Sequence, residues 1–356
     1  ECVLGSKLAP ETPAYDVQQA CGTGLEATVL VANKIALGQI DCGIAGGVDT
    51  TSDAPIAVNE DLREVLLELN RTKSNAGRLK LLTRLRPQQI VPEIPRNSEP
   101  RTGLSMGEHC ERMAKEWKIS REDQDRLALA SHQKAAAAYE RGFFKDLVVP
   151  FRGLERDGFL RPDTSMEKLG ALKPAFDRTS GQGTLTAGNS TGLSDGASAV
   201  LMASEEWAAK RGLKPKAFLT HADVAAVDFV RGEGLLMAPT IAVPRMLARA
   251  GLTLADFDFF EIHEAFAAQV LCTLRAWESA DYCKNRLGLD RPFGTLDPAK
   301  INVNGSSLAL GHPFAATGTR IVATLAKLLE EKGSGRGLIS ICTAGGMGVT
   351  AILERP

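Results

Sequence analysis

Short apolar strands alternate with helices in the C-terminal part of this chain, and glycine-rich turns connect them. From about residue 216 onward, the hydrophobic pattern predicts a buried strand over 257–263, helices over 264–277 and most of 313–331, and strands over 338–341 and 349–353. This alternation is typical of a layered α/β protein with a mostly parallel sheet. The glycine-rich turns GIAGGVD, NGSSLALGHP and CTAGGMG predict places where backbone closely approaches backbone or a ligand.

The first half of the chain has a similar pattern, which a long helical segment interrupts. The hydrophobic pattern predicts an alanine-rich helix over residues 22–37 and a short strand over residues 42–45. Charged amphipathic helices and proline-bearing loops then follow, before strand-like texture returns at 183–202. We therefore expect an N-terminal half made of residues 1–50 and 184–215, an inserted loop domain of residues 51–183, and a C-terminal half of residues 216–356.

The charge balance and the cysteine pattern narrow the class of protein. The 356 residues include 42 Lys and Arg against 43 Asp and Glu, and this balance gives no reason to expect nucleic-acid binding. The 44% hydrophobic content supplies a core and argues against disorder. The longest stretch without a charged residue, 301–319, has too many polar and turn residues to cross a bilayer. Seven scattered cysteines without C-x-x-C spacing indicate a reducing compartment, so we expect a cytoplasmic location and no metal site.

Cys21 is the first candidate for a nucleophile. It lies in the block QQACGTG, directly before the predicted helix, where the positive end of the helix dipole favours a thiolate. Gly22 and Gly24 leave room for a bulky thioester to approach the sulfur. The alternative is a buried, inert cysteine, which is the commoner role of a single cysteine.

Three further residues lie where a loop enters a helix or where a strand ends. His312 precedes Pro313 at a predicted helix start, where it could accept a proton from a thiol or donate to an oxyanion. Cys342 and His263 each end a strand, and α/β proteins usually bind ligands at such ends. The alternatives are a hydrogen-bonded core histidine at 312 and a small apolar residue at 342. Because imidazole titrates near neutral pH, we expect His263 to change charge there.

Four blocks in this order, QQACGTG, HEAF, NGSSLALGHP and CTAGGMG, resemble the thiolase superfamily. The resemblance runs from about Tyr15 to the end, and it is strongest to degradative 3-ketoacyl-CoA thiolases of the trifunctional-enzyme β-subunit type. It implies a thiolase fold, with two duplicated α/β halves in five layers (α-β-α-β-α) and a mainly helical loop domain inserted in the first half. It also implies CoA-dependent thiolytic cleavage of 3-ketoacyl-CoA in fatty-acid β-oxidation, through an acyl-cysteine intermediate.

The resemblance assigns roles to the candidate residues. Cys21 would attack the acyl group, His312 would activate Cys21, and Cys342 would exchange a proton with the α-carbon of acetyl-CoA. His263 would complete one oxyanion site, and the backbone N–H groups of Cys21 and Ala344 would form a second. Gly345, Glu264 and Asn304 would support these sites. The family implies no permanently bound cofactor, with CoA and acetyl-CoA as substrates that contact Met106, Ala187, Gly188, Asn189, Ser190, Thr191, Met237 and Phe266.

Several features depart from the family pattern, among them His263, where many thiolases have Asn, and Ser105, where many have His. Ala344 replaces a glycine of the usual C-x-G-G-G block, so its N–H stays available only if its φ angle is negative. Cys21 lies much closer to the first residue than the nucleophile of other thiolases does, and we therefore expect the natural chain to contain more of the first domain. Two alternative functions stay open: an acetoacetyl-CoA thiolase that runs the Claisen condensation, and a non-catalytic thiolase-like binding or scaffold subunit.

The segment 71–90 contains six basic residues and no acidic residue. It could be a solvated helix pair, a patch that steers the CoA phosphates, a docking surface for a hydratase/dehydrogenase partner subunit, or a membrane-surface contact through residues 60–90. The resemblance also implies a homodimer or homotetramer, because an exposed sheet edge needs covering.

Overall fold

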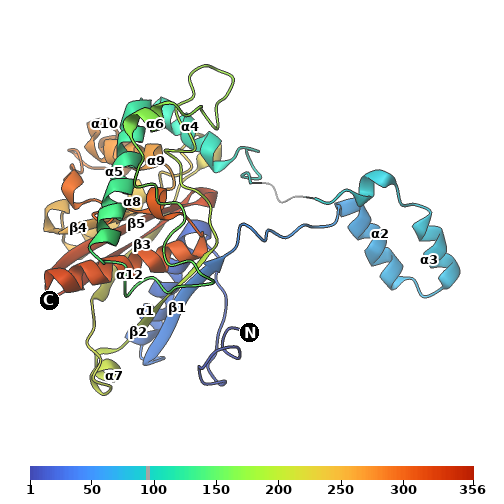
Figure 1. The fold of residues 1–356 in the computed structure, drawn as a ribbon, viewed down its shortest axis with the longest axis horizontal. Helices are drawn as coiled ribbons and strands as arrows, with labels where there is room; N and C mark the ends of the chain where they lie inside the picture. Colours follow the sequence, from blue (N-terminus) through green and yellow to red (C-terminus); the bar gives the residue numbers. More distant parts are fainter. Residues whose placement is uncertain (94–96) are drawn as a thin grey trace.

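The computed structural model describes residues 1–93 and 97–356, which form two β-sheets with helices between and around them (Figure 1). In the first sheet, β1 (Cys42–Asp49) pairs with β2 (Gly196–Ala203) in antiparallel register. The second sheet has the strand order β3-β6-β5-β4, and these strands span Phe218–Ala226, Met347–Arg355, Gly335–Thr343 and Phe259–Ile262. The α/β class is therefore confirmed.

The expectation of a mostly parallel sheet is wrong for the described part of the chain. Strands β4 and β5 run parallel, whereas β3–β6, β5–β6 and β1–β2 are antiparallel. The physical reason at β5–β6 is the short connection η6 (Ala344–Gly346), in which Gly345 and Gly346 have φ angles of 75° and 73°. A connection of this length can join only antiparallel neighbours, because a parallel crossover needs a dozen or more residues.

Two central helices lie between the sheets. Helix α1 (Thr23–Ala36) packs against α12 (Ala315–Lys332), and both contact the two sheets. A Cβ atom built on Gly318 would lie 2.1 Å from the Leu25 backbone nitrogen, and one on Gly24 would lie 2.5 Å from the Ala315 oxygen. The two glycines therefore allow the close approach of the helices that positions the loops in front of them.

The described elements form four of the five expected layers. Helix α8 (Pro239–Ala250) covers the far face of the four-stranded sheet and contacts α9 (Ala267–Glu278). The opposite outer face, on β1 and β2, presents the exposed side chains of Ile44, Val48 and Leu201. The order across the described chain is thus β1–β2, α1 with α12, the four-stranded sheet, and then the outer helices.

The segment between β1 and β2 is mainly helical. It contains α2 (Glu60–Arg71), α3 (Asn75–Leu82), α4 (Met106–Glu116), α5 (Arg121–Glu140) and α6 (Met166–Gly170). Helices α4, α5 and α6 lie against the main body, whereas α2 and α3 stand apart from it (Figure 1). The pairing of β1 with β2 brings the two ends of this segment together, as an insertion requires.

The shorter elements connect these layers. The α-helices are α7 (Glu205–Ala209), α10 (Ala280–Leu287) and α11 (Ser307–Leu310), and the remaining 3-10 turns are η1 (Ala20–Gly22), η2 (Pro87–Ile90), η3 (Phe229–Arg231), η4 (Leu254–Asp256) and η5 (Pro298–Lys300). The helix predicted from residue 264 begins only at Ala267, which leaves His263 and Glu264 in irregular backbone after β4. Of the helices in the described ranges, none is long and apolar enough to cross a membrane.

Candidate active site

Cys21 lies in the tight turn η1, immediately before α1. Its side chain is buried, with 1% of its surface exposed. The preceding residue, Ala20, has a φ angle of 46°, which a non-glycine residue adopts only when the surroundings hold it there. The turn is closed by the Thr23 hydroxyl, which donates to the Ala20 carbonyl and accepts from the Gln19 N–H. This closed turn fixes the direction of the Cys21 sulfur.

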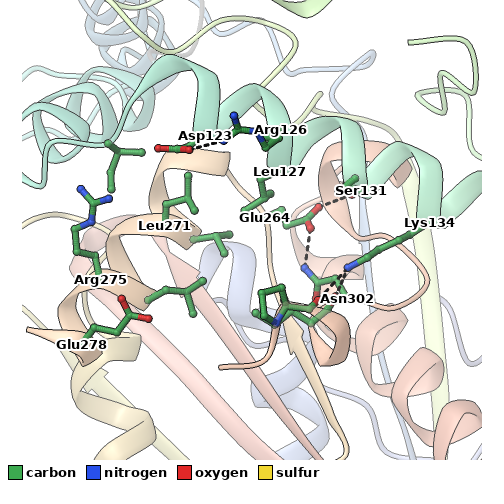
Figure 2. A pocket seen from close by; sticks show the side chains of 16 residues that line it. Asp123, Arg126, Leu127, Ser131, Lys134, Glu264, Leu271, Arg275, Glu278 and Asn302 are labelled. Atoms are coloured by element: carbon green, nitrogen blue, oxygen red, sulfur yellow. Dashed lines mark hydrogen bonds and ion pairs between the residues drawn. The ribbon is translucent and has the colours of Figure 1, made fainter. Parts of the chain in front are cut away.

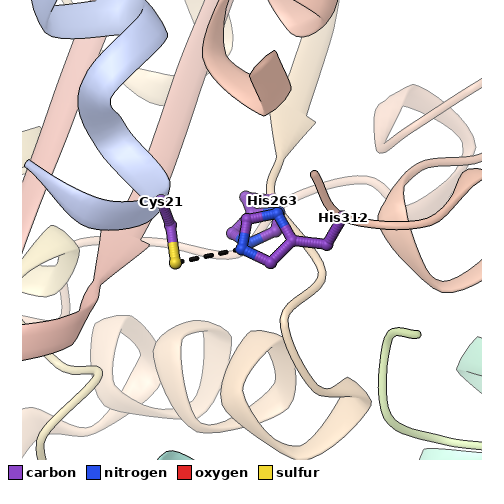
Figure 3. Close-up of side chains that lie close together, drawn as sticks. All are labelled: Cys21, His263 and His312. Atoms are coloured by element: carbon purple, nitrogen blue, oxygen red, sulfur yellow. Dashed lines mark hydrogen bonds between the residues drawn. The ribbon is translucent and has the colours of Figure 1, made fainter. Parts of the chain in front are cut away.

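His312 faces Cys21 from the loop in front of the second central helix, α12. Its Nε2 lies 3.0 Å from the Cys21 Sγ (Figure 3), and its Nδ1 lies 2.6 Å from the Thr317 hydroxyl oxygen. Phe314, between His312 and the helix, has a φ angle of 28°. The packing of α1 against α12 therefore brings the loops before both helices together and forms a thiol–imidazole pair.

Both members of this pair are held in their neutral forms. Burial raises the pKa of the Cys21 thiol to about 12, and hydrogen bonds from the Ala344 and Cys21 N–H groups offset part of that rise. Burial and the positive charge of Arg320 lower the pKa of His312 to about 3. The helix dipole favours a thiolate at Cys21, but the loss of solvation outweighs it. A neutral imidazole next to a neutral thiol can act as a general base when substrate arrives.

His263 lies next to His312, and the ring centroids are 4.3 Å apart. Its Nδ1 is 2.8 Å from the Ser307 hydroxyl oxygen, whereas its buried Nε2 has no hydrogen-bond partner within the described ranges. Burial lowers the pKa of His263 well below its usual 6.5, and repulsion by a protonated His312 and by Arg320 would lower it further. The expectation that His263 titrates near neutral pH is therefore wrong, because the ring has no solvent to stabilise its charged form.

The backbone after β5 supplies the expected donor beside the sulfur. Ala344 keeps a negative φ angle, and the interaction of its N–H with the Cys21 sulfur lowers the thiol pKa. The next N–H, that of Gly345, donates to the Glu99 carboxylate at 2.8 Å and is therefore already engaged. Sequence reasoning did not identify Glu99, which ties this loop to the segment before α4.

Cys342 lies at the end of β5, which packs against the η1 turn that carries Cys21. Its side chain is fully buried. Burial raises its pKa well above the usual 9, and a negative charge on Cys21 would raise it further. Cys342 is therefore protonated at neutral pH, as a proton donor must be before it acts.

Hydrogen bonds engage the Glu264 carboxylate and the Asn304 carbonyl oxygen, whereas the buried Asn304 Nδ2 has no hydrogen-bond partner within the described ranges. The Glu264 carboxylate accepts from Ser131, Asn302 and the Leu308 N–H at 2.7, 2.7 and 3.2 Å. The Asn304 carbonyl oxygen accepts from Arg141 at 2.6 Å. Glu264 thus joins the loop that carries His263 to the loop before α11, which is a supporting role.

The residues expected to contact CoA differ in their burial and in whether other residues already engage their polar groups. Asn189 is committed internally, because its amide accepts from the Thr186 N–H and donates to Asp125 and the Thr184 carbonyl. Ser190 has a buried hydroxyl without a partner in the described ranges, and the Thr191 hydroxyl donates to the Ser307 carbonyl at 2.6 Å. Ala187 is exposed and Gly188 partly exposed, Met106 is partly buried, and Met237 and Phe266 are buried in the adjoining core.

The cavity of about 540 Å³ shown in Figure 2 lies between α5 and α9, away from the sulfur. Leucine and isoleucine side chains form its walls, and Asp123, Arg126, Lys134, Arg275 and Glu278 surround them. Glu264 lines the cavity, but Cys21, His263, His312 and Cys342 do not. The cavity therefore adjoins the loop that carries His263 through Glu264, but it does not open onto the Cys21–His312 pair.

Three side chains of the site could also hold a metal ion. Each of Cys21, His263 and His312 offers one possible ligand atom, and these three atoms lie within 4.8 Å of one another. A thiolate with two imidazoles is a donor set that suits Zn²⁺. The thiol and His312 already share a hydrogen bond, so a metal here would displace the proton that the pair exchanges.

Comparisons with known proteins agree with this fold and site. Residues 1–206 match the model of the thiolase N-terminal domain, and residues 213–355 match that of the thiolase C-terminal domain. The 3-ketoacyl-CoA thiolases of Pectobacterium atrosepticum and Yersinia pestis are each 43% identical over 360 residues, which cover 99% of this chain and 82% of the relative.

Solved structures show the same architecture. Human mitochondrial 3-ketoacyl-CoA thiolase in complex with CoA has a TM-score of 0.79 at 30% identity, covering 99% of this chain and 80% of that one. The acetyl-CoA acetyltransferase of Bacillus anthracis has a TM-score of 0.78 at 33% identity, covering 99% and 81%. The dimeric peroxisomal thiolase of Saccharomyces cerevisiae has a TM-score of 0.75 at 31% identity, covering 100% and 79%.

The buried thiol–imidazole pair lies within a two-sheet α/β fold of the kind that thiolases have. The chain belongs to the thiolase family. It is an acyltransferase with a thiolase fold.

Sequence reasoning missed three residues that hold the histidines. Thr317 contacts His312, and Ser307 contacts both His263 and Arg320. Ser307 and Thr317 lie within or directly after the glycine-rich block around His312, which was the available signal. Arg320 follows Thr317 by three residues, so the two lie about one helical turn apart.

Proposed function

We propose that this chain is an acetyl-CoA C-acyltransferase of fatty-acid β-oxidation, which cleaves 3-ketoacyl-CoA with CoA into acetyl-CoA and a shortened acyl-CoA. The observation that carries the proposal is the buried Cys21–His312 pair, with a 3.0 Å separation between Sγ and Nε2. The relatives at 43% identity, which bear the name 3-ketoacyl-CoA thiolase, support the choice of substrate.

In the first half-reaction, His312 accepts the Cys21 proton as the sulfur attacks the 3-keto carbon. The bond between the second and third carbons of the acyl chain then breaks, the acyl group stays on Cys21, and the acetyl-CoA carbanion leaves. Cys342 gives its proton to this carbanion, which yields acetyl-CoA and leaves a Cys342 thiolate. The raised pKa of Cys342 suits a group that must be protonated when the carbanion forms.

In the second half-reaction, the Cys342 thiolate takes the proton of the CoA thiol. The CoA sulfur attacks the acyl-Cys21 thioester, and the bond to Cys21 breaks. The Cys21 sulfur recovers its proton from the His312 imidazolium, so both cysteines end as thiols. Every catalytic group thus returns to its starting protonation state, because the proton of the CoA thiol replaces the one that Cys342 gave to acetyl-CoA.

Two sets of donors stabilise the negative oxygens. The N–H groups of Cys21 and Ala344 face the sulfur, so they are placed to hold the oxygen on the carbon that bonds to it. His263 has a free Nε2 beside His312, placed for the thioester oxygen of the acetyl-CoA enolate. Removing one such donor typically costs about 10²–10³ in turnover.

CoA would enter along the loop 187–191. Ser190 offers a buried hydroxyl that has no partner among the described residues, and this hydroxyl suits an amide of the pantetheine arm. Met106 and Met237 lie in the cores that flank the site and offer adaptable apolar surface. The human mitochondrial thiolase was solved with CoA, which supports a CoA site on this fold.

A second candidate function is the condensation of two acetyl-CoA molecules to acetoacetyl-CoA. The structural likeness to the Bacillus anthracis acetyl-CoA acetyltransferase favours it. The same residues serve both directions, because Cys342 removes the α-proton in condensation and supplies it in thiolysis. The two candidates therefore differ in substrate length and direction rather than in catalytic groups.

Helices α2 and α3 form a projecting arm, which we propose as the contact of the enzyme with a membrane surface. The arm exposes the apolar side chains of Leu66, Leu67, Leu79 and Leu82. Six basic residues lie within 71–90, and such a mixture suits an anionic lipid surface. Cosedimentation with anionic and neutral vesicles tests this, and binding only to a hydratase/dehydrogenase subunit would favour a protein partner instead.

We further propose a cytoplasmic homodimer or homotetramer. All seven cysteines are free thiols, which suits a reducing compartment. The exposed apolar side chains on β1 and β2 form a surface that a second copy of the chain could bury. The dimeric yeast thiolase supports assembly of this fold.

Thiolysis measured over a series of 3-ketoacyl-CoA chain lengths tests the proposed function. Cleavage of long-chain substrates with CoA, faster than condensation of acetyl-CoA, is the expected result. Activity confined to acetoacetyl-CoA would favour the second candidate, and binding of CoA without any turnover would favour a scaffold subunit.

A further inference from the structure

A chain of hydrogen bonds leads from α12 to the unpaired nitrogen beside the catalytic sulfur. The Arg320 guanidinium donates to the Ser307 hydroxyl at 2.8 Å. The same hydroxyl oxygen lies 2.8 Å from Nδ1 of His263. Ser307 and His263 have no exposed surface, so solvent cannot complete either residue's hydrogen bonds.

The chemistry of these three groups fixes the direction of each hydrogen bond. A guanidinium can only donate, so Arg320 occupies a lone pair of the Ser307 oxygen. The Ser307 hydroxyl has Nδ1 of His263 as its one acceptor within the described ranges, and it therefore donates to that nitrogen. A neutral imidazole carries one proton, so the proton of His263 must lie on Nε2. The opposite assignment would leave both the Ser307 hydroxyl proton and a buried Nε2 lone pair without partners.

We infer that Ser307 and Arg320 are positioning residues that fix the Nε2–H tautomer of His263 and aim this N–H at the thioester oxygen of the substrate. The inference rests on the proposed function, because it takes the acyl-CoA enolate as the acceptor. Nε2 is buried, has no protein partner in the described chain, and belongs to a ring 4.3 Å from that of His312. A fixed donor without a protein partner is what an oxyanion site requires before substrate binds.

The surrounding structure keeps Ser307 at this position. The Thr191 hydroxyl donates to the Ser307 carbonyl at 2.6 Å, and the Glu264 carboxylate accepts the N–H of Leu308 at 3.2 Å. Glu264 also accepts from Asn302, whose amide binds both the N–H and the carbonyl of Ile262. The two loops that carry His263 and Ser307 are therefore joined on both sides of the hydrogen bond between them.

The tautomer decides the function of His263 because the ring stays neutral. Burial, His312 and Arg320 all lower the pKa of His263, which favours the uncharged ring. An imidazolium would donate from both nitrogens and need no tautomer control, whereas a neutral ring donates from one nitrogen only. Without Ser307, the proton could move to Nδ1 and leave a lone pair facing the substrate oxygen.

The nitrogen NMR spectrum of histidine-labelled enzyme tests the tautomer without any substrate. The chain has five histidines, and His263→Asn assigns the His263 signals by their loss. We expect the wild type to show Nε2 as the protonated nitrogen and Nδ1 as the acceptor. In Ser307→Ala, the two nitrogens should shift toward an average of both tautomers. Protonation of Nδ1 in the wild type would overturn the inference.

Steady-state kinetics of two serine variants test whether the Ser307 hydroxyl contributes to turnover. The control is Ser306→Ala, because the Ser306 hydroxyl is buried one residue away and has no partner within the described ranges. Ser307→Ala should lower kcat about tenfold, less than the loss of a whole oxyanion donor, with little change in the KM for CoA or in the alkylation rate of Cys21. Ser307→Thr, which keeps the hydroxyl, should recover most of the loss.

The outcomes separate this inference from the proposed function. Equal loss in Ser306→Ala and Ser307→Ala, or no loss in the folded Ser307→Ala enzyme, would overturn the positioning role. If the wild type shows no thiolysis, the proposed function fails, and the NMR measurement still decides which nitrogen carries the proton. A Ser307→Ala variant that does not fold leaves the wild-type spectrum as the deciding result.

Discussion

The His312 imidazole lies 3.0 Å from the Cys21 sulfur although 291 positions separate the two residues in the chain. Each residue precedes one of two central helices, and glycines at the contact of those helices let them approach closely. The reactive pair is thus a product of helix packing rather than of local sequence. The geometry of the pair therefore depends on the contact between α1 and α12.

The pH dependence of Cys21 alkylation should follow a buried thiol rather than an activated one. Burial raises the thiol pKa to about 12, so the thiolate fraction grows about tenfold for each pH unit below that value. Iodoacetamide labelling of Cys21, followed by peptide mass spectrometry, should speed up continuously from pH 6 to pH 10. A rate that is already constant at pH 7 would mean that the free enzyme holds a thiolate.

Replacing Cys342 by alanine should separate the two chemical steps. Cys21 can still take an acetyl group from acetyl-CoA, because its pair with His312 is intact. Exchange of the α-protons of acetyl-CoA with deuterated solvent should stop, because the proton donor is absent. The control is Cys283→Ala, which removes a buried thiol outside the site. Equal loss of acetylation and exchange in Cys342→Ala would assign that residue a different role.

Acid should destabilise the fold through its two buried active-site histidines. Burial lowers the pKa of His312 to about 3 and that of His263 well below 6.5, so both stay neutral while their unfolded forms take up protons. The unfolded chain binds more protons below pH 6.5, so the free energy of unfolding falls as pH drops from 6.5 toward 3. His312 should remove about 2 kcal/mol between pH 7 and pH 5, and His263 should act in the same direction.

Denaturant unfolding at pH 7 and pH 5 measures this loss. His263→Asn should reduce the difference between the two pH values, because an amide does not titrate. His221→Asn provides the matched control, since this residue lies on β3 outside the active site. Identical pH dependence in the wild type and His263→Asn would show that His263 is not buried as a neutral ring.

Zinc should inhibit the enzyme reversibly. Donor atoms of Cys21, His263 and His312 lie within 4.8 Å of one another, and binding of Zn²⁺ would convert the thiol into a metal-bound thiolate. A chelator should restore activity, and enzyme acetylated on Cys21 should be protected. His263→Asn should weaken inhibition by removing one ligand. Equal inhibition of the wild type and that variant would place the metal elsewhere.

The sequence was sufficient to place the main chemical groups, because glycine-rich turns before helices mark where Cys21 and His312 lie. It was misleading on the protonation of Cys21. A helix dipole contributes about 0.3–1 kcal/mol, up to about 2 kcal/mol, in favour of a thiolate. The rise of the Cys21 pKa from 9 to about 12 corresponds to about 4 kcal/mol against it. Burial of this extent follows from tertiary packing, which local sequence does not report.

The partners of His263 were beyond sequence reasoning for a related reason. Ser307 on α11 contacts His263, and Arg320 on α12 contacts Ser307, so only the assembled layers bring the three together. The strand directions were missed because the hydrophobic pattern of a buried strand is the same in parallel and antiparallel sheets. The three-residue connection between β5 and β6 was the one local signal that could have corrected them.

The central claim is that Cys21 carries the acyl group after His312 accepts its proton. Peptide mass spectrometry after brief mixing with acetyl-CoA tests this directly. We predict a labile acetyl group on Cys21 in the wild type and in Cys342→Ala, with Cys21→Ala unlabelled and His312→Ala labelled far more slowly. An acetyl group on another residue, or turnover at the full rate by Cys21→Ala, would contradict the account.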